Sequence, residues 1–162
     1  MAAKVLILMG SKSDAEVMSE ASRVLDALGI PSTTTVSSAH RSPARTRKIV
    51  REAEEKGCLV IIAGAGMAAH LAGVVAAETV LPVIGVPLAS SPLAGLDALL
   101  STAQMPGGIP VATMAIGKAG AQNAAYLAAQ ILALSDAKLG NKLRQRRREM
   151  AAAVAAAAKE IR

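Results

Sequence analysis

Short apolar runs alternate with amphipathic stretches along most of this chain, and this alternation limits the possible fold more than any other feature. An unbroken apolar run is typical of a parallel strand that is buried on both faces. Such runs predict strands at residues 4–9, 58–63, 82–86 and 109–114, and a β-branched run predicts another strand at residues 33–36. Helical spacing of apolar residues predicts helices at residues 15–28, 43–56, 69–79, 93–102, 119–134 and 136–161. This order predicts a parallel sheet with helices on both faces.

The connections between these elements are short, which narrows the expected topology. Right-handed crossovers favour a flavodoxin-like, doubly wound α/β fold with three layers. We expect a doubly wound catalytic domain over residues 1–135 and a C-terminal helical extension over residues 136–162. Ligands of open parallel sheets bind beyond the carboxyl ends of the strands. The turns that begin at residues 10, 37 and 64 are therefore the first places to search for a site.

The C-terminal segment differs from the rest of the chain in charge and in apolar spacing. The net charge is +6, and residues 138–162 hold eight Lys and Arg against two Asp and Glu, whereas residues 1–137 are balanced. Apolar side chains there form a narrow seam without an evident partner in a compact domain: Leu139, Leu143, Met150, Val154 and Ile161. The seam predicts contact with a helix of a neighbouring copy. With 36 alanines and a single aromatic residue, Tyr126, the chain is expected to form a homo-oligomer.

Composition also argues against several partners and cofactors. A basic tail can bind nucleic acid or an anionic membrane, but base stacking needs aromatic planes that this chain lacks. The uncharged stretch 58–77 has the length of a membrane span, yet its glycines favour a strand, a turn and a small helix. Two histidines and Cys58, all far apart, match no metal spacing. With one cysteine and no signal-peptide pattern, we expect a cytoplasmic protein with no metal, nucleic acid or membrane partner.

The first polar turn is GSKSD at residues 10–14. Gly10 permits a tight turn, Ser11 and Ser13 offer hydroxyl groups, and the helix behind them offers free N–H groups to an anion. The alternative is that Ser13 or Asp14 merely caps that helix. The chain has neither GxGxxG nor GxxxxGK[ST], so the turn indicates neither a dinucleotide nor a triphosphate.

The other two turns each contain one of the two histidines. In the turn at 37–43, Arg41 can hold a phosphate through two parallel hydrogen bonds. Histidine titrates near neutral pH, so His40 can exchange a proton with a substrate. The alternative is a loop histidine beside a solvated arginine. In the turn at 63–73, small residues allow a ligand close to the main chain, and His70 is either a site residue or a packed or capping histidine.

These three turns resemble the PurE family, the N5-carboxyaminoimidazole ribonucleotide mutases of purine biosynthesis. The matching stretches are GSKSD at 10–14, SAHR with a proline at 38–43 and AGAGMAAHL at 63–71. Further matches follow in order as far as about residue 135: GVP at 85–87, QMP at 104–106, GIP at 108–110, AIG at 115–117 and NAA at 123–125. The AAHL stretch resembles class I mutases rather than class II carboxylases, which take free carbon dioxide. Met67 and Ala72 stand where glycine and proline are common.

The resemblance implies a flavodoxin-like subunit in a homo-octamer, with active sites at subunit junctions and without metal or organic cofactor. The implied reaction moves a carboxylate from N5 to C4 of an aminoimidazole ribonucleotide, with His40 as the acid and then the base. The implied ligands of the ribose phosphate are Ser11, Ser13, Asp14, Ser38 and Arg41. The implied ligands of the base and carboxylate are Ala65, Gly66, Ala68, His70 and Leu71. Two alternatives stay open: a class II-like carboxylase that uses free carbon dioxide, or a non-catalytic nucleotide- or nucleic-acid-binding module.

Overall fold

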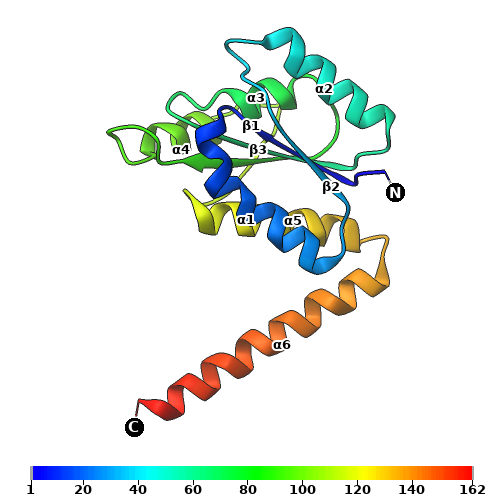
Figure 1. Cartoon of the computed structure of the whole chain (residues 1–162), viewed down its shortest axis with the longest axis vertical. Coiled ribbons are helices and arrows are strands. Elements are labelled where there is room, and N and C mark those ends of the chain that lie inside the picture. The colour runs from blue at the N-terminus through cyan, green and yellow to red at the C-terminus, as the bar shows by residue number, and fades with distance from the viewer. Residues whose placement is uncertain (1, 162) are drawn as a thin grey trace.

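The computed structural model describes residues 2–161, so Met1 and Arg162, at the ends of the two expected ranges, lie outside the described residues. One parallel sheet has the strand order β2-β1-β3-β4-β5, and helices lie on both of its sides (Figure 1). Its strands are β1 (Val5–Met9), β2 (Ser32–Val36), β3 (Val60–Gly66), β4 (Val83–Leu88) and β5 (Ala112–Thr113). The helices are α1 (Ala15–Leu28), α2 (Pro43–Glu55), α3 (Leu71–Ala76), α4 (Leu96–Ala103), α5 (Lys118–Ala133) and α6 (Ala137–Glu160), with a short 3-10 helix, η1 (Lys12–Asp14). This strand order confirms the flavodoxin-like fold.

The sheet is the middle of three layers. Helices α1 and α5 cover one face, and α2, α3 and α4 cover the other (Figure 1). Along β1, Ile7 faces α1 and α5, whereas Leu6 and Leu8 face α2 and α3. Alternate side chains of a strand point to opposite faces, so a strand covered on both sides has to be apolar throughout. This double burial is the physical reason for the unbroken apolar runs.

Strand β3 is longer than the sequence pattern predicts. It continues through Gly64 to Gly66 and pairs with β4 as far as Leu88, so the prediction that a turn begins at residue 64 is wrong, and the turn follows Gly66. A β-carbon added at Gly64 would lie 2.3 Å from Sδ of Met18, which packs against the strand from α1. The glycine serves close packing there, although glycine is usually a turn signal. Three predicted elements are instead shorter in the structure: β5, α3 and α4.

Alanine takes the place of large side chains between α5 and the sheet. The α5 alanines that face the core are fully buried: Ala121, Ala124, Ala125, Ala128 and Ala129. Helix α5 packs side by side with α1 on this face (Figure 1). Small side chains allow the helices and the sheet to approach closely, so this core reaches close packing without aromatic residues.

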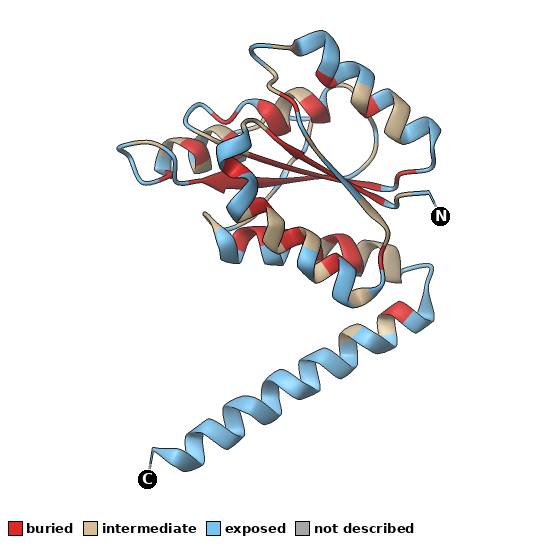
Figure 2. Ribbon diagram, viewed as in Figure 1, coloured by how far each residue is buried: buried red, intermediate tan, exposed pale blue. Residues whose placement is uncertain are grey.

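Helix α6 begins on the core and then departs from it. The Asp136 carboxylate caps it by accepting the backbone N–H groups of Lys138 at 2.9 Å and Leu139 at 3.0 Å. Leu139 is buried and Leu143 packs against the same core, so the expectation that the whole seam lacks a partner in its own chain is wrong for these two. Beyond them α6 projects away from the sheet and is exposed (Figure 2). The remaining seam residues are 53% exposed at Met150, 71% at Val154 and 87% at Ile161.

The uncharged stretch 58–77 forms β3, a turn and α3, and most of it is buried within the protein. In the described part of the chain, no helix combines the length and apolar character that crossing a bilayer requires.

Candidate functional site

The loops that follow β1, β2 and β3 meet at the carboxyl edge of the sheet and enclose a cavity of about 520 Å³. Every residue that the sequence singles out for binding or catalysis lines this cavity: Ser11, Ser13, Asp14, Ser38, His40, Arg41, Ala65, Gly66, Ala68, His70 and Leu71. Adjacent strands order these loops side by side, because β1 lies between β2 and β3. The structure thus brings together residues that lie up to 60 positions apart in the chain.

The loop after β1 is held by its own polar side chains. Ser11 caps η1, and its hydroxyl oxygen accepts a hydrogen bond from the Ser13 hydroxyl, with the two oxygens 2.9 Å apart. The Asp14 carboxylate in turn accepts the backbone N–H of Ser11 at 2.9 Å, which completes a capping box. Burial raises the pKa of the Asp14 carboxyl above its ordinary value, although the hydrogen bond from Ser11 opposes this. These residues therefore cap the turn and also line the cavity.

Arg41 ties the loop after β2 to the loop after β1. Its backbone N–H and its Nε donate to the Ser38 hydroxyl at 3.2 and 3.3 Å, and its Nη2 donates to the Gly10 carbonyl at 3.3 Å. Arginine has five N–H donors, and these contacts use only part of them. The side chain is exposed and its guanidinium is held at the cavity by neutral groups. This arrangement suits an anionic ligand, because the guanidinium contacts a hydroxyl and a carbonyl, which leave its positive charge in place.

His40 and His70 form a pair at the cavity. Nε2 of His40 lies 2.7 Å from Nδ1 of His70, and the rings meet edge to face with centroids 4.7 Å apart. His70 occupies the position before α3, but its side chain makes no capping hydrogen bond. The sequence places both histidines in site loops without predicting their contact. One ring has to donate and the other accept, so each fixes the tautomer of its partner.

The third wall is a tight turn that follows β3. The N–H of Ala69 donates to the Gly66 carbonyl at 3.0 Å, and Ser101 donates its hydroxyl to the Ala68 carbonyl. Ser90, which follows β4, also lines the cavity and was not predicted. A β-carbon at Gly66 would lie 1.7 Å from the Ser90 hydroxyl oxygen, so this glycine admits Ser90. Ser90 could have been predicted, because the loops after β3 and β4 lie at the same carboxyl edge of the sheet.

Neither a metal cluster nor a reactive thiol accompanies these loops in residues 2–161. No three side chains of the His, Cys, Asp and Glu types gather there in a way that would hold a metal ion. Cys58 is buried just before β3, and burial raises the pKa of its thiol. A cysteine in this state is a core residue rather than a nucleophile.

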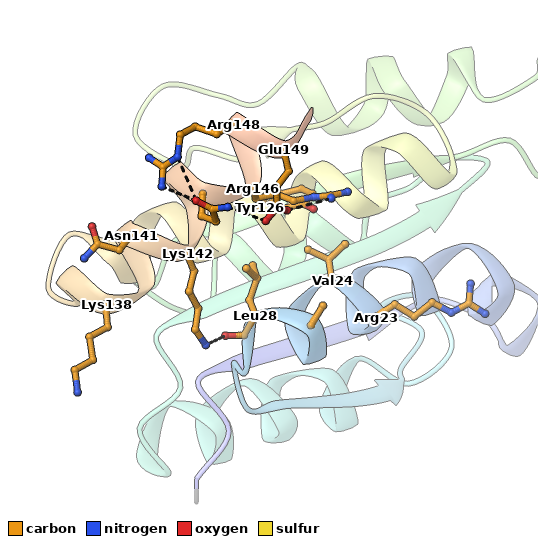
Figure 3. Close-up of a pocket in the computed structure, with 12 residues that line it drawn as sticks. Arg23, Val24, Leu28, Tyr126, Lys138, Asn141, Lys142, Arg146, Arg148 and Glu149 are labelled. Carbon is orange, nitrogen blue, oxygen red and sulfur yellow. Dashed lines mark hydrogen bonds and ion pairs between the residues drawn. The ribbon is translucent and has the colours of Figure 1, made fainter. Parts of the chain in front are cut away.

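A larger groove, of about 820 Å³, lies between α1, α5 and the first half of α6 (Figure 3). Its wall includes Val24 and Leu28 of α1 and Tyr126 of α5, and Lys142 bridges it by donating to the Leu28 carbonyl at 2.9 Å. The groove contains neither histidine nor a glycine-rich turn, and it lies where α6 leaves the core. Despite its size, the groove therefore lacks the histidine side chains and the accessible main chain that the smaller cavity offers to a substrate.

Comparisons with known proteins show the family to which the chain belongs. The family model described as AIR carboxylase matches residues 4–153. The chain is 57% identical over 141 residues to the N5-carboxyaminoimidazole ribonucleotide mutase of Bacillus subtilis, covering 87% of each chain. It is 52% identical over 155 residues to the mutase of Pyrococcus horikoshii, covering 96% of this chain and 86% of that one. The crystal structure of Treponema denticola PurE superposes with a TM-score of 0.85 at 29% identity, over 93% of this chain and 92% of that one. The protein therefore belongs to the AIR carboxylase family.

Proposed function

We propose that this protein is an N5-carboxyaminoimidazole ribonucleotide mutase of purine biosynthesis, an isomerase that moves a carboxylate within its substrate. Two curated relatives that are 52% and 57% identical have this activity as their name. The observation that carries the proposal is the cavity itself, where a histidine pair lies beside an arginine and several serines. The substrate has a phosphate group, which needs cationic and hydroxyl donors. It also has a carboxylate whose transfer needs a group that gives and takes a proton.

The ribose phosphate binds at the loops after β1 and β2. Arg41 and the hydroxyl groups of Ser11, Ser13 and Ser38 donate to phosphate oxygens. Asp14 is an acceptor and binds ribose hydroxyls. The base and its carboxylate then lie against the turn after β3, where small side chains leave the main chain accessible: Ala65, Gly66 and Ala68, with His70 and Leu71 beside them.

The carboxylate moves in two steps through carbon dioxide. Protonated His40 gives a proton to N5, the bond between N5 and the carboxylate carbon breaks, and its electrons stay on nitrogen. The electron-rich C4 then attacks the trapped carbon dioxide and forms the new carbon–carbon bond. Neutral His40 removes the proton from C4, which restores the aromatic ring and returns the histidine to its starting state.

His70 positions His40 for both steps. Their 2.7 Å contact orients the His40 ring, and it assigns one ring nitrogen to His70 and the other to the substrate.

The proposal extends to assembly and location. Residues 1–135 form the catalytic domain, and residues 136–162 contact another copy in a homo-octamer, with the active sites near subunit junctions. The exposed Met150, Val154 and Ile161 support a contact outside the single chain. The enzyme works in the cytoplasm, without metal or organic cofactor and without a nucleic acid or membrane partner; its reduced, buried Cys58 fits that compartment.

The decisive test is turnover by the purified protein. With N5-carboxyaminoimidazole ribonucleotide, we expect the C4-carboxylated isomer to form without added metal or cofactor. With aminoimidazole ribonucleotide and modest bicarbonate, we expect no comparable rate. Turnover of the second mixture alone would instead support a carboxylase that uses free carbon dioxide, and turnover of neither would overturn the proposal.

A further inference from the structure

Met67 occupies a backbone conformation that a methionine rarely adopts. It is the first central residue of the turn from Gly66 to Ala69, and its φ is 55°. Turns with a positive φ at this position favour glycine, because a β-carbon crowds the backbone there. A strained residue persists only where the surroundings impose it, and such residues gather at functional sites. The strain at Met67 therefore asks for a functional explanation.

Packing does not explain it, because the side chain is 61% exposed and takes no part in either apolar core of the described chain. It does line the substrate cavity. Most of the other lining residues are polar or no larger than alanine, and Leu71 is only 3% exposed and fixed in the core. Met67 is thus the long, apolar and unrestrained side chain of this wall.

We propose that the Met67 side chain covers the carboxylate side of the cavity and retains carbon dioxide between its release from N5 and its capture by C4. This inference rests on the proposed mutase function. Methionine is unbranched and flexible, so it can close over an irregular opening. An apolar cover also excludes water, and water would otherwise compete for the freed carbon dioxide. The turn places Met67 between Gly66 and Ala68, in the wall assigned to the base and carboxylate.

The cover has a defined chemical consequence when it is removed. After N5 accepts its proton and the carbon–nitrogen bond breaks, carbon dioxide can leave before C4 attacks. The products are then aminoimidazole ribonucleotide and free carbon dioxide, and one proton has been consumed. Carbon dioxide from solution can enter in its place and be fixed at C4. Loss and exchange of the carboxyl carbon therefore measure the cover directly.

Three substitutions separate the side chain from the backbone strain. Met67→Gly removes both, Met67→Ala removes the side chain and keeps the β-carbon, and Met67→Leu keeps an apolar side chain of similar size. Each variant and the wild type turn over substrate in buffer that contains isotopically labelled bicarbonate. Mass spectrometry reports the label in the product and the fraction released as aminoimidazole ribonucleotide, and thermal unfolding reports stability.

We expect Met67→Gly and Met67→Ala to increase loss and exchange of the carboxyl carbon at least about tenfold, and Met67→Leu to stay within about twofold of the wild type. Relief of the positive φ should raise the melting temperature of Met67→Gly alone, by about 2–4 °C. If Gly and Ala variants retain the carboxyl carbon as well as an active wild type does, the cover is refuted and the mutase function stands. A wild type without turnover refutes both.

Discussion

The cavity at the carboxyl edge of the sheet and the exposed part of α6 differ in whether their side chains find partners within the chain. In the cavity, polar side chains bind one another or nearby backbone: Arg41 reaches the Gly10 carbonyl, and His40 reaches His70. On the part of α6 beyond Leu143, Arg148 donates to Gln145 of the same helix. The apolar side chain of Val154 there is 71% exposed. A single chain thus preorganises its cavity, whereas it leaves the end of α6 exposed, where we propose a contact with another copy.

Two alanine-rich helices show the same contrast. The inward alanines of α5 have no exposed surface, because α1 and the sheet lie against them. The alanines at 151–153 and 155–158 of α6 are all exposed. Alanine has the highest helix propensity, and this is enough to favour a helix in both places. Whether the helix is buried is decided by what lies beside it, which composition does not reveal.

We expect the largest effect from a substitution of a cavity residue, and it concerns turnover. His40→Asn removes the group that gives and takes the proton, so we expect turnover to fall at least about 100-fold. Asparagine keeps a polar side chain, so binding of the ribonucleotide and the oligomeric state should be retained. Steady-state assays, calorimetry and light scattering check the three properties. Turnover above about a tenth of the wild-type rate would contradict the role of His40.

The next effect concerns assembly and falls on α6. Met150→Gln with Val154→Gln puts polar groups on the exposed seam, whereas Leu143 is avoided because it packs on its own core. Burial of each apolar side chain in a neighbouring copy would contribute about 1.5–3 kcal/mol, so we expect the octamer to dissociate at micromolar concentration. The circular dichroism of each chain should change little. An intact octamer in light scattering would show that this half of α6 is not an interface.

A smaller effect is expected on affinity when the anion-binding group changes. Arg41→Ala removes a charged donor and should weaken ribonucleotide binding roughly 10–100-fold, with assembly unchanged. Arg41→Lys is the matched control for charge. It should recover only part of the affinity, because an ammonium group cannot reproduce the planar fork that also reaches Ser38 and Gly10. Equal affinity of the lysine variant and the wild type would indicate a general electrostatic role.

The cavity was more predictable from the sequence than its internal contacts. Unbroken apolar runs require burial on both faces, and parallel strands place their carboxyl ends at one edge, so the loops of Ser11 and Arg41 had to be neighbours. The 2.7 Å contact between His40 and His70 depends on loop geometry that no local pattern encodes. Gly64 carries a turn signal in sequence, yet it pairs within the sheet, and the Met18 side chain from α1 occupies the space that a β-carbon would need. Likewise, spacing revealed the seam of α6 but not which of its residues turn back to the core.

The smallest expected effect comes from the charges of α6. It distinguishes assembly through the apolar seam from nucleic acid binding through the basic side chains. Arg144→Glu with Arg147→Glu reverses two exposed charges on the helix that carries the charge excess. Exposed charges contribute little to stability, typically within about 0.5 kcal/mol. We therefore expect assembly and turnover close to those of the wild type, and weak, sequence-independent binding to RNA or DNA in either protein. Fluorescence anisotropy over a salt series checks the binding. Tight binding of nucleic acid that is lost on charge reversal but kept in the Met150→Gln, Val154→Gln variant would show that α6 binds nucleic acid. That result would contradict the proposed role of α6 in assembly.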